Sequence, residues 1–283
     1  MTTYNISFSG FTLRFQFPTP VVLHEELASF LSQEACAPDA EYEIRLLTEP
    51  LRPDGPMVFS QMGMQLYQTE NGWLRIYTPL IEEDGCQVAC FLRPDGKNIL
   101  YYPAKKWDFY ASPFHCIHLI GIETLLLQHD ALLLHSSVVQ YQGKVVLFSG
   151  PAFAGKSTQA DLWAAHLGAD ILNGDRCVIR RYPDGFYGGG SPWCGTSGIY
   201  RRESAPLAGI FLVHQATENR VQRLGAAAFP PLFSQTVVNS WDSQFMRSIT
   251  HLFEDLLRQV PVYRLDCRPN KEAALLACRT VFG

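Results

Sequence analysis

The chain has 283 residues, of which 47% are hydrophobic and 18% charged, so it is long enough and apolar enough to bury a large core. Its formal net charge is −4 and its basic residues cluster no further than pairs, which argues against nucleic acid or a membrane as the main partner. No apolar run is long enough to span a bilayer, and the first residues lack a signal-peptide pattern, so we expect a cytoplasmic protein.

Residues 1–112 alternate short β-like runs with turn clusters. In these runs apolar side chains alternate with polar ones, as in strands with one buried face. Clusters of Pro, Asn, Asp and Gly stand between the runs and favour turns. We therefore predict a smaller, antiparallel, β-rich N-terminal domain with one short helix near residues 25–33. The clearest predicted strands lie near residues 4–8, 13–17, 42–46 and 74–77.

The second predicted domain covers residues 113–283 and opens with an apolar helix over 114–127. A hairpin follows, in which residues 132–140 and 144–149 form strands around a turn at 142–143. Strands and helices then alternate, which predicts an α/β core. The remaining predicted elements are helices at 157–167, 248–259 and 271–281 and strands at 169–180, 207–214 and 260–265.

Residues 150–158 read Gly-Pro-Ala-Phe-Ala-Gly-Lys-Ser-Thr, which matches the phosphate-loop motif G-x-x-x-x-G-K-[ST]. The motif stands between a predicted strand and a predicted helix, an order that aims backbone N–H groups and a helix N-terminus at a polyphosphate. Glycines permit the tight backbone path, the lysine can reach the terminal phosphates, and the serine hydroxyl can ligate magnesium. The predicted nucleotide-binding residues are Gly150, Ala154, Gly155, Lys156, Ser157 and Thr158, with Ser157 also a metal ligand.

Two further residues are candidates for the chemical step. Asp175 belongs to the next apolar strand, where an acid can hold magnesium or accept a hydroxyl proton during phosphoryl transfer. The alternative is that Asp175 only caps a turn with Asn173 and Gly174. His135 lies on the strand that precedes the loop through the tight hairpin, so we expect its imidazole beside the loop and near Asp175, although a lone histidine in a strand also fits a buried core.

Other motifs give weaker indications. The segment 188–198 is rich in glycine and serine and is predicted either to close over a ligand or to be an ordered turn anchored by Trp193. Cys86 and Cys90 with Cys116 and His118 come nearest to a zinc pattern, but their flanks favour reduced core cysteines. Arg201, Arg202 and Arg223 are further candidates for phosphate contacts. Asn270-Lys271 begins like a guanine-reading motif but lacks its aspartate.

The chain resembles the HPr kinase/phosphorylase family of bacterial serine kinases, whose fold is akin to that of ATP-dependent phosphoenolpyruvate carboxykinase. The resemblance rests on His135-Ser-Ser-Val-Val, on the loop at 150–158, and on the turn at 173–176, which reads Asn-Gly-Asp-Arg. It implies the use of ATP and Mg²⁺, with His135 positioning the acid and the phosphate and Asp175 sharing magnesium and base duties with Ser157. The family pattern has an aspartate where this chain has Gly174, and Asp-Ser where it has Pro-Ala at 151–152.

A looser resemblance links the Pro-Trp-Cys-Gly segment at 192–195 to related kinases found with peptide-modification gene clusters. The first hypothesis is an ATP-dependent, HPr kinase-like enzyme that phosphorylates a serine on a protein or peptide, with Asp175, His135 and Lys156 as catalytic residues. The alternative is a nucleotide-binding regulatory or delivery module in a peptide-modification system, without kinase turnover. A homo-oligomer is compatible with either hypothesis.

Overall fold

The computed structural model describes residues 1–21, 25–32, 37–61, 63–78, 87–111, 117 and 119–283. It is a mixed α/β protein with two large sheets. The chain divides into two compact units, Met1–Leu125 and Leu126–Gly283. Residue 112, near which we predict a domain boundary, lies outside the described residues, so that boundary stays a prediction.

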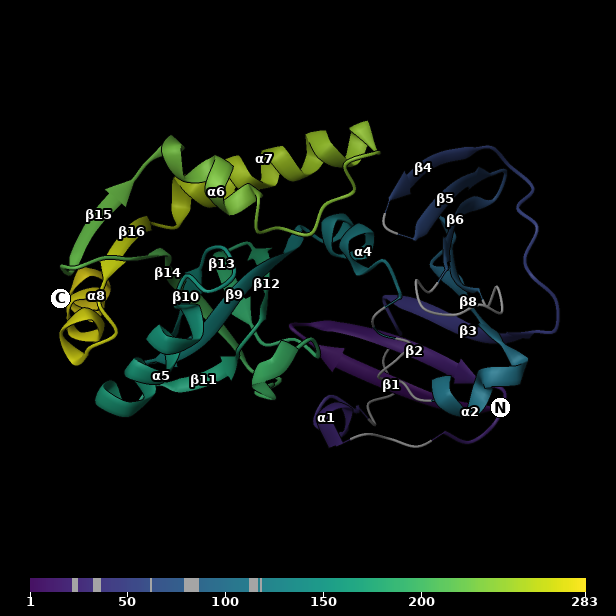
Figure 1. Ribbon diagram of the computed structural model, residues 1–283, viewed down its shortest axis with the longest axis horizontal. Helices are drawn as coiled ribbons and strands as arrows, with labels where there is room; N and C mark the ends of the chain where they lie inside the picture. Colours follow the sequence, from purple (N-terminus) through teal and green to yellow (C-terminus); the bar gives the residue numbers. More distant parts are fainter. Residues whose placement is uncertain (22–24, 33–36, 62, 79–86, 112–116, 118) are drawn as a thin grey trace. The chain divides into compact units, whose positions relative to one another are not determined.

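The first unit is built on an eight-stranded sheet in the order β1-β2-β3-β8-β7-β6-β5-β4 (Figure 1). The predicted strands near 4–8, 13–17, 42–46 and 74–77 correspond to β1, β2, β3 and β6. The unit's elements are β1 Thr2–Phe8, β2 Phe11–Phe17, α1 Glu25–Ala28, β3 Ala40–Leu47, β4 Met57–Gln61, β5 Met64–Thr69, β6 Gly72–Tyr77, β7 Val88–Leu92, β8 Lys97–Pro103, η1 Ala104–Lys106 and α2 Trp107–Tyr110, while α4 Ile122–Gln128 crosses into the second unit.

Two expectations for the first unit need correction. The sheet is mixed rather than antiparallel, because β3 runs parallel to both β2 and β8. Local turn signals predict hairpins, and they carry no information about pairings between strands that a longer segment separates. The helix expected at 25–33 is shorter, since α1 ends at Ala28, and residue 33 lies outside the described part.

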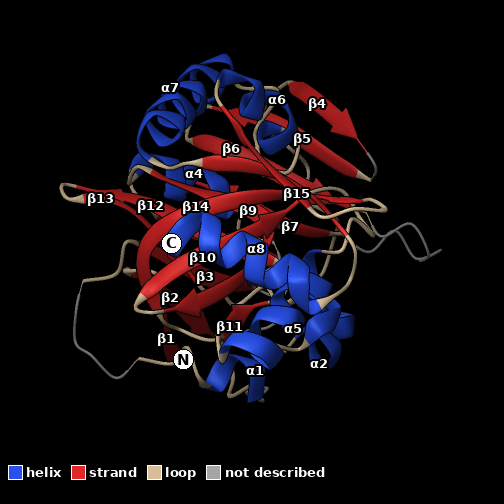
Figure 2. Ribbon diagram, turned by 90° about the vertical axis from the view of Figure 1, so that its left-hand side faces the viewer, coloured by secondary structure: helices blue, strands red, loops and turns tan. Residues whose placement is uncertain are grey.

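The second unit holds a sheet in the order β10-β9-β12-β13-β14-β16-β15, with β11 paired to β9 (Figures 1 and 2). An additional parallel pairing of β10 with β14 closes β10, β9, β12, β13 and β14 into a ring. Its elements are β9 Ala131–Tyr141, β10 Lys144–Ser149, α5 Lys156–Leu167, β11 Asp170–Asn173, β12 Arg176–Tyr182, β13 Gly185–Gly189, η2 Gly195–Ser197, β14 Ser204–Gln215, β15 Arg220–Leu224, η3 Ala226–Ala228, α6 Phe229–Phe233, α7 Ser243–Gln259, β16 Val262–Cys267 and α8 Lys271–Phe282.

Helices cover both faces of this sheet, because successive side chains of β10 belong alternately to two apolar clusters. Val145 and Leu147 belong to the apolar cluster that includes the buried side chains of α7, whereas Val146 and Phe148 belong to the cluster with α5 and α8. Successive residues of a strand face opposite sides, so a strand that is apolar throughout needs cover on both. The resulting three layers present the carboxyl ends of β10, β14 and β16, which run parallel, at one edge of the sheet.

The predicted elements of this unit are mostly confirmed, with informative differences. The strand predicted at 169–180 is two strands, β11 and β12, interrupted at Gly174 and Asp175. The helix predicted at 248–259 begins earlier, at Ser243, where the Asp242 carboxylate caps the amides of Gln244 and Phe245. The helix predicted at 114–127 lies partly outside the described residues, and it is shorter than predicted, because residues 119–121 are not helical and α4 begins at Ile122.

Candidate functional site

A glycine loop, residues 150–155, connects β10 to α5 and fixes where the helix begins. Gly150 has a φ of 145°, which strains any residue with a side chain, and a Cβ there would lie tightly, 3.2 Å from the backbone oxygen of Val213. Gly155, at a φ of 104°, occupies the position just before the first helical residue, Lys156. The two glycines therefore allow the chain to pass from a buried strand into a helix within one tight loop.

Lys156 lies folded against this loop. Its Nζ donates hydrogen bonds to the backbone oxygens of Gly150 and Pro151, both at 3.0 Å. Burial lowers the pKa of the ammonium, because removing water disfavours the charged form, and the Asp175 carboxylate partly opposes this effect. The ammonium is thus held close to the loop and within the field of Asp175.

His135 lies at the point of β9 where the pairing with β12 on one edge ends and the pairing with β10 on the other edge begins. Up to His135, which faces Arg176, β9 pairs with β12, and from Ser136, which faces Ser149, it pairs with β10. The Ser149 hydroxyl donates to the His135 carbonyl at 2.9 Å and reinforces this junction. The end of β10 therefore lies directly beside His135, as the hairpin predicts.

The His135 imidazole meets the Asp175 carboxylate, with 3.2 Å between Nε2 and Oδ1. The second carboxylate oxygen, Oδ2, lies 3.2 Å from Nε of Arg176. The hydrogen bond from His135 is the main cause that holds the pKa of Asp175 below its usual range, and the charge of Arg176 adds to it, while partial burial works in the opposite direction. Asp175 is thus an ionised group held from two sides, and its predicted proximity to His135 is confirmed.

The turn that carries Asp175 is shaped by Asn173, a fully buried residue. Its Oδ1 accepts hydrogen bonds from the backbone N–H groups of Asp175 and Arg176, each at 2.8 Å. Its Nδ2 donates to the backbone oxygen of Ser191 at 2.8 Å. This side chain replaces ladder bonds at the break between β11 and β12 and so sets the direction of the Asp175 side chain.

Gly174 has no room for a side chain. A Cβ on Gly174 would lie 2.2 Å from Oγ of Ser197 and 2.4 Å from its Cβ. The neighbouring Gly195, at a φ of 56°, packs its backbone against the Asp175 side chain, where a Cβ would meet Cγ at 2.8 Å. The segment of Gly195–Ser197 therefore fills the space that an acid at position 174 would need.

The segment 188–198 has two parts with different surroundings. Trp193 and Cys194 are buried, and the Ser191 hydroxyl donates to the backbone oxygen of Arg176 at 2.9 Å, which agrees with a turn anchored by Trp193. Residues 195–198 are exposed. Of the arginine candidates, Arg201 forms an exposed ion pair with Asp170 at 2.9 Å.

A cavity of about 350 Å³ opens at the start of α5. Its lining comes from the glycine loop and the start of α5, from Gly174 in the Asn173 turn, and from Gln215 at the end of β14. Asp175 and His135 do not line it, and Ala154 lines a neighbouring cavity instead. The lining residues are Phe153, Gly155, Lys156, Ser157, Thr158, Gly174 and Gln215.

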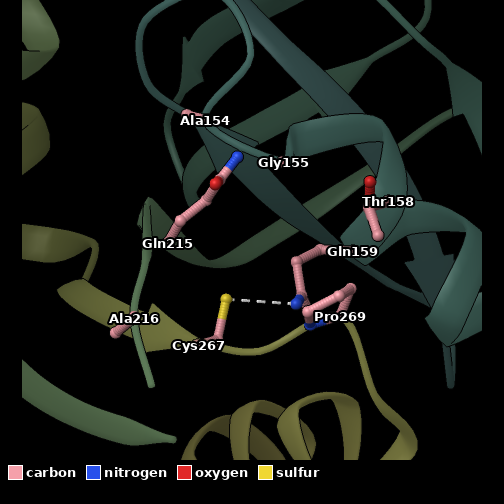
Figure 3. A pocket seen from close by; sticks show the side chains of 8 residues that line it. All are labelled: Ala154, Gly155, Thr158, Gln159, Gln215, Ala216, Cys267 and Pro269. Carbon is pink, nitrogen blue, oxygen red and sulfur yellow. Dashed lines mark hydrogen bonds between the residues drawn. The ribbon is translucent and has the colours of Figure 1, made fainter. Parts of the chain in front are cut away.

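Two glutamines near the loop are missed by motif reasoning. Gln215 at the end of β14 donates from Nε2 to the backbone oxygen of Phe153 at 2.7 Å and so braces the tip of the loop. Gln159, on α5, is 1% exposed and lines the neighbouring cavity (Figure 3). One signal was available for Gln159: it is a polar residue on the helix face that Ala160 and Trp163 continue into the core.

Among the described residues, no three His, Cys, Asp or Glu side chains cluster closely enough to hold a metal ion by themselves. Cys86, Cys116 and His118 of the weak zinc pattern lie outside the described part, and Cys90 is a buried free thiol. No helix in the described ranges is both long and apolar enough to cross a membrane. Asn270, the start of the incomplete guanine motif, caps α8 through a bond from the Ala273 amide at 3.1 Å.

Comparison with known proteins gives little. The sequence matches no protein-family model and no curated protein. A solved structure of the Hpr(Ser) kinase/phosphatase from Coxiella burnetii is similar over 51% of this chain and 85% of that chain, with 11% sequence identity and a TM-score of 0.29. A similarity of this size carries no argument about function, so the function has to be argued from the site itself.

Proposed function

We propose that this chain is an ATP-dependent kinase that transfers the γ-phosphoryl group to a serine hydroxyl of a protein or peptide. One observation supports the proposal most: Lys156 lines a cavity at the start of a helix, and the turn that contributes Gly174 to the same lining carries the Asp175 carboxylate, which His135 and Arg176 fix. Phosphoryl transfer needs such a pairing of a cation for the phosphates with an acid for the attacking hydroxyl.

The glycine loop supplies the phosphate end of this site. The first amides of a helix have no intrahelical partner, and the helix dipole adds partial positive charge at the same place. At the start of α5 these groups border the cavity together with the Lys156 side chain. In the proposed complex Lys156 exchanges the carbonyl oxygens of Gly150 and Pro151 for phosphate oxygens.

Magnesium fits the donor set. Mg²⁺ prefers oxygen ligands and is commonly held by one or two protein groups plus substrate phosphates and water, so it needs no cluster of three side chains. Ser157, which is exposed and lines the cavity, and Asp175 would hold it. When bound, the ion would neutralise charge on the phosphates.

The protein residues then act as follows. The acceptor oxygen forms a bond to the γ-phosphorus, the bond from that phosphorus to the β–γ bridging oxygen breaks, and ADP leaves. The hydroxyl proton passes to the Asp175 carboxylate, which His135 and Arg176 orient. The low pKa of Asp175 suits a reaction in which the acceptor is positioned first and loses its proton late, as in a loose transition state.

The test is transfer of labelled phosphate from ATP to a panel of serine-containing peptides encoded near the gene, with ADP formation measured in parallel. We expect acceptor-dependent ADP formation, and we expect the label on serine. Absence of transfer to every peptide, together with absence of ATP binding, would contradict the proposal.

A second candidate is a nucleotide-binding regulatory or delivery module without turnover. The packing of Ser197 against Gly174 favours it, because the position where the resembling family carries an acid has no space for one. ATP binding without acceptor-dependent ADP formation would select this module over the kinase.

A further inference from the structure

A second cavity of about 270 Å³ lies next to the glycine loop, and the proposed phosphate contacts do not use it (Figure 3). It shares Gly155 and Thr158 with the cavity at the start of α5, so the two are adjacent. Its far side is formed by residues at the ends of β14 and β16 and just after them. The lining residues are Ala154, Gly155, Thr158, Gln159, Gln215, Ala216, Cys267 and Pro269.

The position of the cavity is that of a ligand site in an α/β sheet. It lies beyond the carboxyl ends of β10, β14 and β16, which run parallel to one another. Ligands of α/β proteins commonly bind outside the carboxyl ends of parallel strands, and β10, β14 and β16 end together here although β10 and β14 also belong to the closed ring. A nucleotide whose phosphates lie at the glycine loop must place its base nearby, and this cavity is adjacent to the loop.

Gln159, one of the residues that line the cavity, carries a buried amide oxygen without a hydrogen-bond partner in the described part of the chain. Its side chain is 99% buried, its Nε2 donates to Sγ of Cys267 at 3.2 Å, and its Oε1 has no hydrogen-bond partner among the described residues. Burying an amide oxygen without a partner costs free energy, because its hydrogen bonds to water are lost and no other donor replaces them. Figure 3 shows the Gln159 side chain directed at Cys267 between α5 and the end of β16.

We infer that this second cavity binds the base of the nucleotide and that the Gln159 carbonyl accepts a hydrogen bond from the 6-amino group of adenine. The donor end of Gln159 is engaged by Cys267, so the carbonyl is the end of the side chain that is left for a ligand. Adenine presents an amino donor at position 6, whereas guanine presents an oxygen there, which would oppose one acceptor to another. This assignment rests on the proposed nucleotide site and adds its base specificity.

The first experiment compares three ligands on the unmodified protein by calorimetric titration with Mg²⁺ present: ATP, purine riboside triphosphate and inorganic tripolyphosphate. Purine riboside triphosphate differs from ATP only in lacking the 6-amino group. We expect it to bind roughly tenfold more weakly than ATP, as for the loss of one hydrogen bond to a buried acceptor. Equal affinities of ATP and this analogue would overturn the base assignment.

The second experiment uses Gln159→Met, which keeps the side-chain length and removes the acceptor. We expect ATP affinity to fall to that of the analogue, while the affinity for tripolyphosphate stays unchanged. Gln222→Met is the matched control, because Gln222 is exposed on β15, outside the lining of the cavity. If ATP binds Gln159→Met as tightly as the unmodified protein, the inference is wrong and the phosphate site is unaffected. If neither ATP nor tripolyphosphate binds the unmodified protein, the proposed function fails as well.

A third measurement needs no substitution. The Cys267 thiol lines the cavity, so ATP should slow its alkylation and tripolyphosphate should not. Cys278 on α8 does not line the cavity and serves as the internal control in a site-resolved mass-spectrometric assay. Protection of Cys267 by tripolyphosphate to the same extent as by ATP would count against a base in this cavity.

Discussion

Lys156 and Asp175 both have a pKa below the usual range, yet for opposite reasons. Burial is the main cause for Lys156, so its charged form is disfavoured by its surroundings. Hydrogen bonding from His135 is the main cause for Asp175, so its charged form is favoured. At the loop end the lysine charge is held by two backbone oxygens and opposed by burial, while at the acid end the side chains of His135 and Arg176 stabilise the charge of Asp175.

The two groups should therefore affect stability with opposite signs. Asp175 contributes stability that is fully present above the pKa of an unfolded aspartate, about 4, and that is lost as the pH falls through the lower folded value. Lys156 costs stability below its folded pKa, and this cost is relieved as the pH rises from that value towards the higher unfolded one.

Asp175→Asn is expected to reduce phosphoryl transfer by a factor of about 100 or more, because it removes the proton acceptor and a metal ligand. ATP binding should be nearly unchanged, since the loop and Lys156 remain. Single-turnover transfer at saturating ATP is the measurement. Asp170→Asn, which changes an exposed ion pair with Arg201, is the control. Full activity of Asp175→Asn would assign the chemistry to another acid.

Gly174→Ala is expected to destabilise the fold by about 1–3 kcal/mol, the usual cost of overpacking. The reason is the 2.2 Å approach of the new Cβ to Oγ of Ser197. Because Ser197 is the obstacle, Ser197→Gly in the same chain should recover most of the loss, which urea unfolding of both variants would measure. A Gly174→Ala variant as stable as the parent would show that the segment 195–197 moves freely.

Lys156→Ala is expected to weaken Mg-ATP binding at least roughly tenfold, about 1.4 kcal/mol, through the loss of a charge-assisted phosphate contact. The free energy of unfolding should not fall by a comparable amount at neutral pH, since burial already disfavours this charge. Calorimetric titration and chemical unfolding test the two halves, with the exposed Lys144→Ala as the control. Unchanged ATP affinity would remove the loop from the nucleotide site.

The smallest expected effect is that of His135→Ala on the pKa of Asp175 and on stability in acid. It removes the main cause of the low pKa of Asp175, so this pKa should rise and acid unfolding should begin at a higher pH. The carboxyl carbon shift of Asp175 in an NMR titration reports the change, and the exposed His166→Ala serves as the control. An unaltered titration of Asp175 would mean that Arg176 alone sets its ionisation.

The sequence predicts the parts of the second unit in which local signals agree. The hairpin, β10 and α5 follow from apolar runs, a two-residue turn and paired glycines, and they place His135 beside the end of β10. The polar turn Asn-Gly-Asp-Arg at 173–176 signals the break at Gly174, but the apolar residues on both sides of it favour one continuous strand. The edge strand β15 is too polar to stand out, with Arg220, Gln222 and Arg223 exposed. Gln159 could not be predicted as a site residue, because its role depends on its contact with Cys267, which is distant in sequence.

The closed ring of strands in the second unit has a consequence for the order of folding. The β9–β10 hairpin joins neighbours in sequence, whereas the β10–β14 pairing must bring Val145 next to Leu207. Non-local pairings form more slowly because a long loop must first be closed. We expect pulse-labelled amide hydrogens of the hairpin to become protected first and those of β14 later. The backbone of Val213 that confines Gly150 would then arrive last, so the glycine loop would reach its final path only at the end of folding.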